Sequence, residues 1–218
     1  MVINNSRRKV IFIHIPKCGG VSIEDSIHKA LGGDSVITKS KLINKPPRDD
    51  DDTCKGLKLH STMYDYSRYF KENIDDFYIF TFIRNPWKRM VSHWEYLINE
   101  GYNNRINEKD KLTFSKFVQI YKSGVLEYTS EVGYDYYLKD TIGTKLNFVG
   151  KLENINEDLV KVGLDIKIEI KDVLHSNKTN PNLKLYQDWK DYYNPRTKDM
   201  VYDIFKEYII DYNYDFEE

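Results

Sequence analysis

Apolar positions gather in two stretches of this chain, and each stretch has the order apolar run, turn, helical repeat. The first stretch covers residues 11–27 (IFIHIPKCGGVSIEDSI), and its apolar run ends at a Pro-Lys-Cys-Gly-Gly turn. A buried strand is predicted by Ile11, Phe12, Ile13 and Ile15. The two glycines let the main chain turn tightly, with its N–H groups pointing inward. The stretch therefore predicts a strand, a tight turn and a helix.

The turn has the features of an anion site. Ser22, with Asp25 three residues later, predicts the N-cap of the helix. A helix N-terminus offers N–H donors and roughly half a positive charge, which favour a phosphate or sulfate, and Lys17 adds a full charge. No Gly-Lys-Ser/Thr follows the turn, so an ordinary ATP or GTP kinase is disfavoured. A Gly-Gly pair also occurs in turns that bind nothing, so the motif alone leaves that alternative open.

The second stretch covers residues 77–97 (FYIFTFIRNPWKRMVSHWEYL). Its first part, Phe77 to Ile83, is apolar and aromatic, which favours a strand buried on both faces of a parallel sheet. Pro86 fits the first position of a helix. Helical spacing then connects the apolar residues Trp87, Met90, Val91, Trp94 and Leu97.

Two polar residues of this stretch can bind an anion together. Arg84 follows the strand, and Ser92 lies eight residues later, about two helical turns on, so its hydroxyl can share an anion with the guanidinium. Taken singly, Arg84 could pair with a carboxylate and Ser92 could face water.

Together the two stretches resemble the sulfotransferase superfamily, in particular the branch with carbohydrate sulfotransferases. The first is similar to the family's 5′-phosphosulfate loop, commonly PKTGGTS after a strand, and the second to its 3′-phosphate motif, RNP with a later serine. Residues 148–159 (FVGKLENINEDL), 175–181 (HSNKTNP) and 192–216 are also similar to family segments. The resemblance implies the donor 3′-phosphoadenosine 5′-phosphosulfate (PAPS), with these binding residues: Lys17, Cys18, Gly19, Gly20, Val21, Ser22, Arg84, Ser92 and Lys178.

The loop departs from the family pattern at two positions. Cys18 and Val21 stand where the family usually has threonines, so two hydroxyl donors to the 5′-phosphate are missing. Main-chain N–H groups, Lys17 and Ser22 remain, and we expect the site to survive with weaker binding. Cys18 is interpreted as a small space-filling residue in preference to a redox-sensitive thiol.

His60 is the candidate catalytic base. A lone histidine is usually structural, but relatives that sulfate heparan-type glycans at the 2-O and 6-O positions carry a catalytic histidine in this region. The resemblance therefore implies that His60 accepts the proton of the acceptor hydroxyl, as a neutral imidazole can. It also implies that Lys17 stabilises the charge that grows on the leaving 5′-phosphate. The other histidines, His14 among them, are expected to serve packing or to lie at the surface.

Composition adds limits. The 218 residues suit a single sulfotransferase domain, 1–218, of the α/β class with a P-loop-like three-layer fold, a mostly parallel sheet flanked by helices. The net charge of −1 does not point to nucleic acid, and two cysteines make neither a disulfide framework nor a zinc site. No apolar stretch reaches membrane-spanning length, and the first residues lack the core of a signal peptide. If the chain is complete, a cytoplasmic enzyme is expected.

The sequence thus predicts a PAPS-dependent sulfotransferase that acts on a hydroxyl, with a saccharide as the expected acceptor. Tyr64, Tyr66 and Tyr69, close to His60, are candidates for contact with the sugar. Two alternatives stay open, a nucleotide-dependent phosphotransferase of the same fold and an inactive module that binds PAP (the desulfated donor) or another anion.

Overall fold

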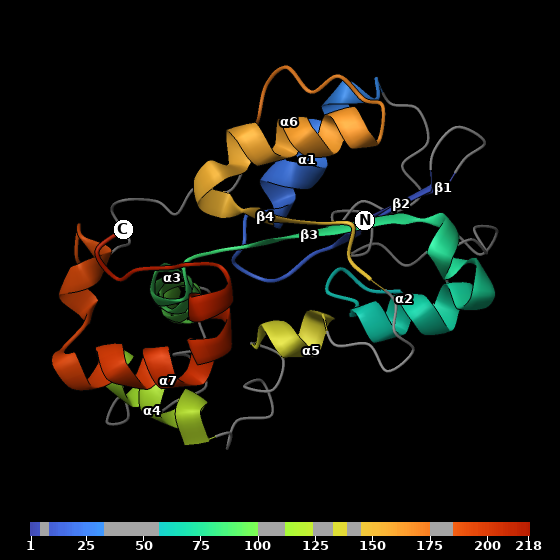
Figure 1. Ribbon diagram of the computed structural model, residues 1–218. Coiled ribbons are helices and arrows are strands. Elements are labelled where there is room, and N and C mark those ends of the chain that lie inside the picture. The colour runs from blue at the N-terminus through green and yellow to red at the C-terminus, as the bar shows by residue number, and fades with distance from the viewer. Residues whose placement is uncertain (5–8, 33–56, 100–111, 124–132, 139–144, 175–184) are drawn as a thin grey trace. The chain divides into compact units, whose positions relative to one another are not determined.

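The computed structural model contains a four-stranded sheet with the strand order β1-β2-β3-β4 (Figure 1). The strands are β1 (Val2–Asn4), β2 (Lys9–Ile13), β3 (Tyr78–Ile83) and β4 (Phe148–Lys151). β2, β3 and β4 run parallel, and β1 pairs antiparallel with β2. The structure describes residues 1–4, 9–32, 57–99, 112–123, 133–138, 145–174 and 185–218. The predicted mostly parallel sheet is confirmed.

The helices and their bounds complete the element list. The α-helices are α1 (Gly20–Ala30), α2 (Met63–Phe70), α3 (Pro86–Asn99), α4 (Phe114–Ser123), α5 (Tyr134–Leu138), α6 (Ile155–Asp165) and α7 (Pro195–Asp211). Short 3-10 helices are η2 (Lys71–Asp76), η6 (Leu152–Asn154) and η8 (Trp189–Tyr192). The chain divides into two compact units, described here one at a time: a first unit of Met1–Ile83 with Tyr134–Asn177, and a second of Arg84–Gly133 with Lys178–Glu218. The single domain stays a prediction.

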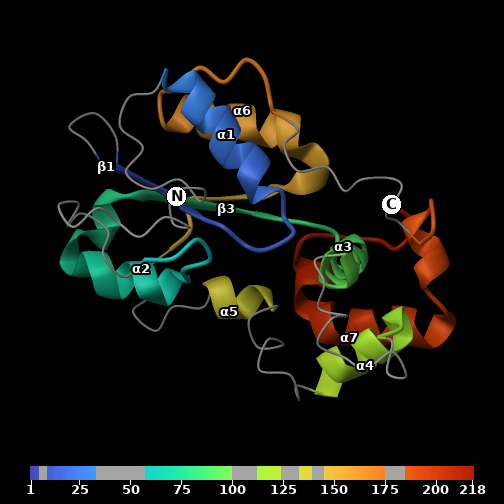
Figure 2. The same ribbon diagram turned by 180° about the vertical axis from the view of Figure 1, so that it is seen from behind.

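In the first unit, helices cover both faces of the sheet. α1 and α6 lie on one face and α2 and α5 on the other (Figures 1 and 2). Because side chains alternate along a strand, Phe12 of β2 and Phe80 of β3 point to the same face, where their rings stack 5.0 Å apart. They form one core with Ile23 of α1 and Leu159 of α6. Truncating Phe80 to alanine would cost about 3–5 kcal/mol of stability, the usual range for a buried phenylalanine.

β1 was not predicted from the sequence. Three residues are too few to show an alternating pattern, yet Val2 and Ile3 are fully buried and Ile3 belongs to the core beside α1 and α6. The predicted strand of the first stretch is therefore the second strand, β2, and the glycine turn follows it.

The second unit is helical in its described part. α3, α4 and α7 pack against one another. The helical pattern read from residues 86–97 is confirmed, since Trp87, Met90, Val91 and Trp94 of α3 are buried. Trp94 meets Phe114 of α4 edge-on, at 6.1 Å between ring centroids. α3 therefore holds its polar face in a fixed orientation within this unit.

Candidate functional site

The turn between β2 and α1 has the backbone of an anion-binding loop. Lys17 has φ 67° and Gly19 has φ 76°, with Cys18 between them at negative φ. Left-handed residues interleaved with right-handed ones turn successive N–H groups toward one side, as in anion-binding nests. A left-handed conformation costs a lysine on the order of 1–2 kcal/mol, so the fold holds Lys17 in a conformation it does not favour. Strain of this kind gathers at functional sites.

Both glycines of the turn are required by close packing within the first unit. A Cβ on Gly19 would lie 2.4 Å from Leu152 Cδ1, and one on Gly20 would lie 2.2 Å from His14 Nε2. Gly19 also has the left-handed φ that glycine tolerates best. The Gly-Gly pair therefore fixes where the loop and the start of α1 lie.

Ser22 is not the N-cap. The N-cap of α1 is Gly19, which makes no side-chain capping bond, and Ser22 lies buried in the first helical turn. The left-handed Gly19 leads directly into the helix, so α1 begins before Ser22. The first intrahelical bond runs from Ile23 N to Gly19 O, and the N–H groups of Gly20, Val21 and Ser22 precede it. These are the groups that a helix N-terminus presents to an anion.

Cys18, predicted as a space-filling residue, is a free thiol and only 1% exposed. Burial at this level keeps a thiol from solvent oxidants, so the packing role accounts for it better than a redox role. Val21 is half-buried in the first turn of α1.

His60 lies beside the start of this loop. Its Nδ1 is 2.9 Å from the main-chain oxygen of His14, and the two imidazole rings meet edge-on with centroids 4.8 Å apart. A carbonyl oxygen only accepts, so the Nδ1–H of His60 is the donor. In the neutral ring Nε2 then carries the lone pair, the form that a general base requires.

The surroundings keep His60 neutral. His60 as a residue is exposed, but its ring lies against His14, and this burial together with the nearby charge of His14 lowers the pKa of His60 to about 4. The hydrogen bond to the oxygen of His14 and the carboxylate of Glu24 act in the opposite direction without cancelling the shift. At neutral pH His60 therefore accepts a proton without first having to lose one.

Behind His60 lies a buried polar pair that sequence reasoning missed. His14 is 4% exposed and Glu24 is 1% exposed, and His14 Nδ1 lies 3.1 Å from Glu24 Oε1. The main-chain nitrogen of Met1 is 3.7 Å from the same carboxylate oxygen. A signal was present in the sequence, because Glu24 lies three residues before the apolar Ile27, a spacing that places both on one side of the helix.

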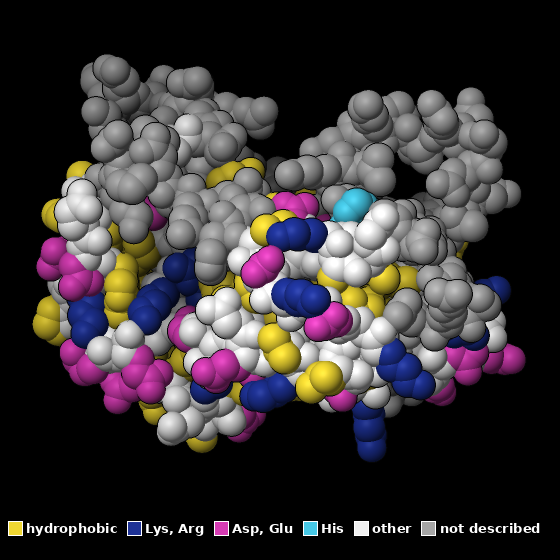
Figure 3. All heavy atoms as spheres, turned by 90° about the horizontal axis from the view of Figure 1, so that it is seen from above, with side chains coloured by type: hydrophobic (Ala, Val, Ile, Leu, Met, Phe, Trp, Pro, Cys, Tyr) yellow, Lys and Arg dark blue, Asp and Glu magenta, His cyan; other side chains and the backbone are white. Residues whose placement is uncertain are grey.

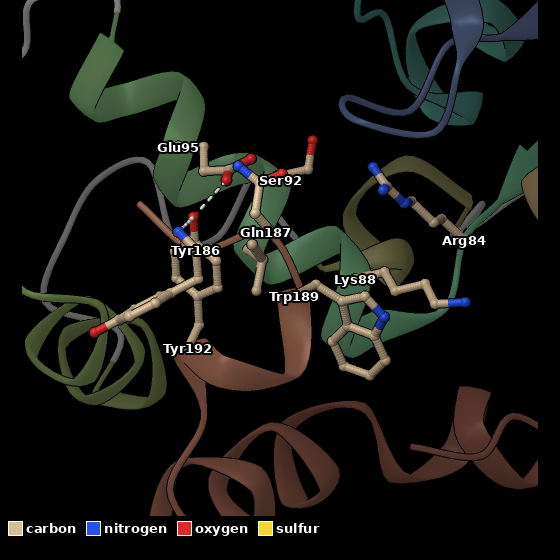
Figure 4. A pocket seen from close by; sticks show the side chains of 9 residues that line it. Arg84, Lys88, Ser92, Glu95, Tyr186, Gln187, Trp189 and Tyr192 are labelled. Carbon is tan, nitrogen blue, oxygen red and sulfur yellow. Dashed lines mark hydrogen bonds between the residues drawn. The ribbon is translucent and has the colours of Figure 1, made fainter. Parts of the chain in front are cut away.

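In the second unit, Arg84 and Ser92 line one pocket of about 120 Å³ (Figure 4). Arg84 directly follows β3 in the chain, and Ser92 comes from α3. The other lining residues are Lys88, Val91, Glu95, Tyr186, Gln187, Trp189 and Tyr192. Figure 4 shows Arg84 and Lys88 toward one end, and Glu95, Tyr186 and Tyr192 toward the other. The cationic end suits a phosphate.

A hydrogen-bond network fixes the opposite wall of this pocket. The Tyr192 hydroxyl accepts bonds from the main-chain N–H groups of Leu185 and Tyr186, at 2.9 and 3.1 Å, and donates to Glu95 Oε1 at 2.6 Å. Burial and the bond to Glu95 raise the pKa of Tyr192 to about 12, so the hydroxyl keeps its proton. Sequence reasoning missed Lys88 and Glu95, although their spacing from Ser92, four and three residues, places all three on one face of α3.

The predicted residues fall into groups. Residues 17–22 and His60 belong to the first unit, and Arg84 and Ser92 belong to the second. Lys178 and the second cysteine, Cys54, lie outside the described residues. The binding and catalytic roles expected of residues 17–22, His60, Arg84, Ser92 and Lys178 stay predictions.

Of the three tyrosines near His60, Tyr66 is 2% exposed and is not available to a sugar. Tyr64 is exposed, and Tyr69 is half-buried.

The described surface and helices add three findings. Basic and acidic side chains are interspersed on the face drawn in Figure 3, with no large patch of either sign. Within the ranges that the structure describes, no helix combines the length and the apolar character needed to cross a membrane. The same ranges contain no group of three or more His, Cys, Asp or Glu residues that could hold a metal ion.

The chain was compared with known protein families, curated proteins and solved structures. The family model described as the sulfotransferase family matches residues 1–215, nearly the whole chain. No curated protein and no solved structure matches the chain.

Proposed function

The chain belongs to the sulfotransferase family, whose fold is P-loop-like, and we propose that it transfers the sulfuryl group of PAPS to a carbohydrate hydroxyl. One observation carries the proposal. His60, held as a neutral base, contacts His14, which stands three residues before Lys17 of the loop. A base and an anion loop in one unit are the two elements that sulfuryl transfer to a hydroxyl requires.

The residues present fit the donor. PAPS supplies an activated sulfuryl group on a 5′-phosphate that leaves, and it carries a second phosphate at the 3′ position. The 5′ end would be bound by main-chain N–H groups of the strained loop at Lys17. The two glycines of this loop lie where a side chain would not fit. Arg84 and Ser92, with Lys88 in the same pocket, supply charged and hydroxyl donors for the 3′-phosphate.

His60 and Lys17 divide the chemistry between them. An acceptor hydroxyl is a poor nucleophile until its proton is removed, and Nε2 of His60 holds the lone pair that can take that proton. The Lys17 ammonium opposes the negative charge that grows on the leaving oxygen, assisted by the N–H groups at the start of α1. A fixed positive group of this kind acts mainly in the transition state.

A sugar is the proposed acceptor because α2, which follows His60 closely in the chain, carries exposed aromatic and basic groups. The helix begins at Met63, three residues after His60, and a capping box joins Thr62 and Asp65, with bonds of 2.8 and 3.2 Å. On its first turns Tyr64 is exposed, and the Arg68 guanidinium lies 5.7 Å from its ring centroid. An aromatic face suits the apolar side of a sugar ring, and the guanidinium suits an acidic substituent.

Two measurements test the proposal. In calorimetry, PAP and PAPS should bind more tightly than AMP or ATP, since only the first two carry a 3′-phosphate. ATP binding that equals PAP binding would instead support a nucleotide-dependent phosphotransferase.

Transfer of labelled sulfate from PAPS to a panel of glycans and small alcohols then tests turnover. PAP binding without transfer to any acceptor would indicate an inactive binding module. Activity on simple alcohols but on no glycan would overturn the carbohydrate acceptor alone. The cytoplasmic location stays a prediction.

A further inference from the structure

We propose that Glu24 is a positioning residue for His60, acting through His14: it holds the His14 ring in place, so that His60 keeps Nδ1 as a donor and Nε2 as the acceptor of the substrate proton. The positioning role rests on the proposed function, because it concerns the base of the same reaction. The three residues come from three places, α1, the residue after β2, and the turn before α2, all within the first unit.

Glu24 is a carboxylate where an apolar side chain would be expected. It belongs to α1, which also buries Ile23 and Ile27 completely, together with the two small hydroxyl residues Ser22 and Ser26. Burying a carboxylate is costly unless it is paired and hydrogen-bonded. The pair with His14 at 3.1 Å meets that condition. An ionised carboxylate only accepts, so His14 Nδ1 carries the hydrogen.

The His14 ring is held on three sides. Glu24 binds Nδ1, the main chain of Gly20 lies against Nε2, where even a Cβ would be 2.2 Å away, and the His60 ring lies across the third side at 4.8 Å between centroids. A ring fixed in this way leaves the following loop and the carbonyl group of His14 itself little freedom. That carbonyl oxygen is the acceptor of the His60 Nδ1–H bond.

The carboxylate of Glu24 also affects the pKa of His60. The charged and titratable groups that act on His60 are Glu24, His14 and the amino nitrogen of Met1. Among them only Glu24 raises the pKa of His60 through its charge, while burial, His14 and the amino nitrogen lower it. Replacing Glu24 by a neutral group should therefore make His60 a weaker base as well as a less ordered one.

The first test is made on the unaltered protein and needs no enzyme activity. Long-range ¹⁵N–¹H correlation spectra of the ring nitrogens report which nitrogen of a histidine carries the hydrogen. At neutral pH His60 should be protonated at Nδ1 and not at Nε2. Protonation at Nε2 would overturn the proposal, whatever the variants do.

The second test compares Glu24→Gln with Ser26→Ala. Ser26 lies on the same helix, and its buried hydroxyl donates to Ser22 O at 2.7 Å and accepts from Leu174 N at 2.8 Å, so its loss loosens α1 without touching His14. Glu24→Gln should lower the pKa of His60 measured by NMR titration, and Ser26→Ala should leave it unchanged. A folded Glu24→Gln protein with the wild-type pKa, or an equal shift in Ser26→Ala, would contradict the positioning role.

Turnover gives a third readout. Glu24→Gln should reduce kcat by about 10- to 100-fold, the range found when hydrogen-bonded partners of metal-binding histidines are removed, and should leave PAP affinity and the acceptor KM near wild type. An unchanged kcat in a folded protein would overturn the role. The failure of the proposed function is distinct from this outcome, since it would appear as no sulfate transfer from PAPS by the unaltered protein, with the NMR results unaffected.

Discussion

Acid is the perturbation that most directly tests the environment of His60. If His60 is the base, only its neutral form supports turnover, so the acid limb of the rate profile follows its pKa. In the structure, burial against His14 and the charge of His14 lower that pKa from 6.5 to about 4. The acid limb should therefore lie far below the value for an ordinary histidine.

The size of the effect follows from a single titration. At pH 5.5 a histidine with a pKa of 6.5 would be only about 9% neutral, whereas one with a pKa of about 4 would be about 97% neutral. The wild-type rate should consequently change little between pH 7.5 and about 5.5, where an ordinary imidazole would lose roughly ten-fold.

Stability changes over the same range, and its sign is fixed by the same shift. The pKa of His60 is lower in the folded protein than in the unfolded chain, so between about 4 and 6.5 the unfolded chain binds more protons. The stabilising contribution is present above pH 6.5 and is lost as the pH falls toward 4. Circular dichroism at each pH, and recovery of activity after return to pH 7, separate unfolding from titration.

The assay is the initial rate of transfer from labelled PAPS to an accepted substrate, with kcat/KM recorded because it reports the free enzyme. His60→Ala serves as the control and should lose about 10²–10⁴-fold in kcat while PAP affinity stays near wild type. An acid limb centred near 6.5 in protein that is still folded would refute the reasoning, because it would mean that the ring is hydrated and lacks the contact with His14.

Three further predictions concern the loop and the pocket. Gly20→Ala places a Cβ 2.2 Å from a His14 ring that is held in position, and should cost about 1–3 kcal/mol in urea unfolding, whereas Gly133→Ala, where no described atom lies within 4 Å, should be near neutral. Arg84→Ala should weaken PAP by about 1.5–3 kcal/mol in calorimetry and adenosine 5′-phosphosulfate much less, and equal losses for both would remove Arg84 from the 3′-phosphate site. Lys17→Ala should lower kcat more than it raises the KM for PAPS, and the reverse pattern in steady-state kinetics would indicate a binding role alone.

Local signals determined much of the fold. The strand at residues 78–83 and the helix from Pro86 were predicted because their causes lie within a few residues: an apolar run, a proline that fits a first helical position, and a period that one face of a helix requires. The turn after β2 was predicted for the same reason, since two adjacent glycines favour a tight turn wherever they occur. The sequence also suggested that Arg84 and Ser92 act together, from their spacing of eight residues, and both line one pocket.

The start of α1 and the surroundings of His60 were decided by tertiary structure. Ser22 is a residue type common at N-caps, but the helix starts three residues earlier, at the left-handed Gly19, next to which Leu152 leaves no room for a side chain. His60 and the oxygen it binds are 46 residues apart, and the pair of His14 with Glu24 joins a strand end to a helix. Periodicity in sequence reports which residues turn toward the interior. It does not report which buried groups come into contact there. The hydrogen bonds, the tautomer and the pKa of a residue depend on those contacts, because each is set by atoms within a few ångströms. The chain brings these atoms together only when it folds.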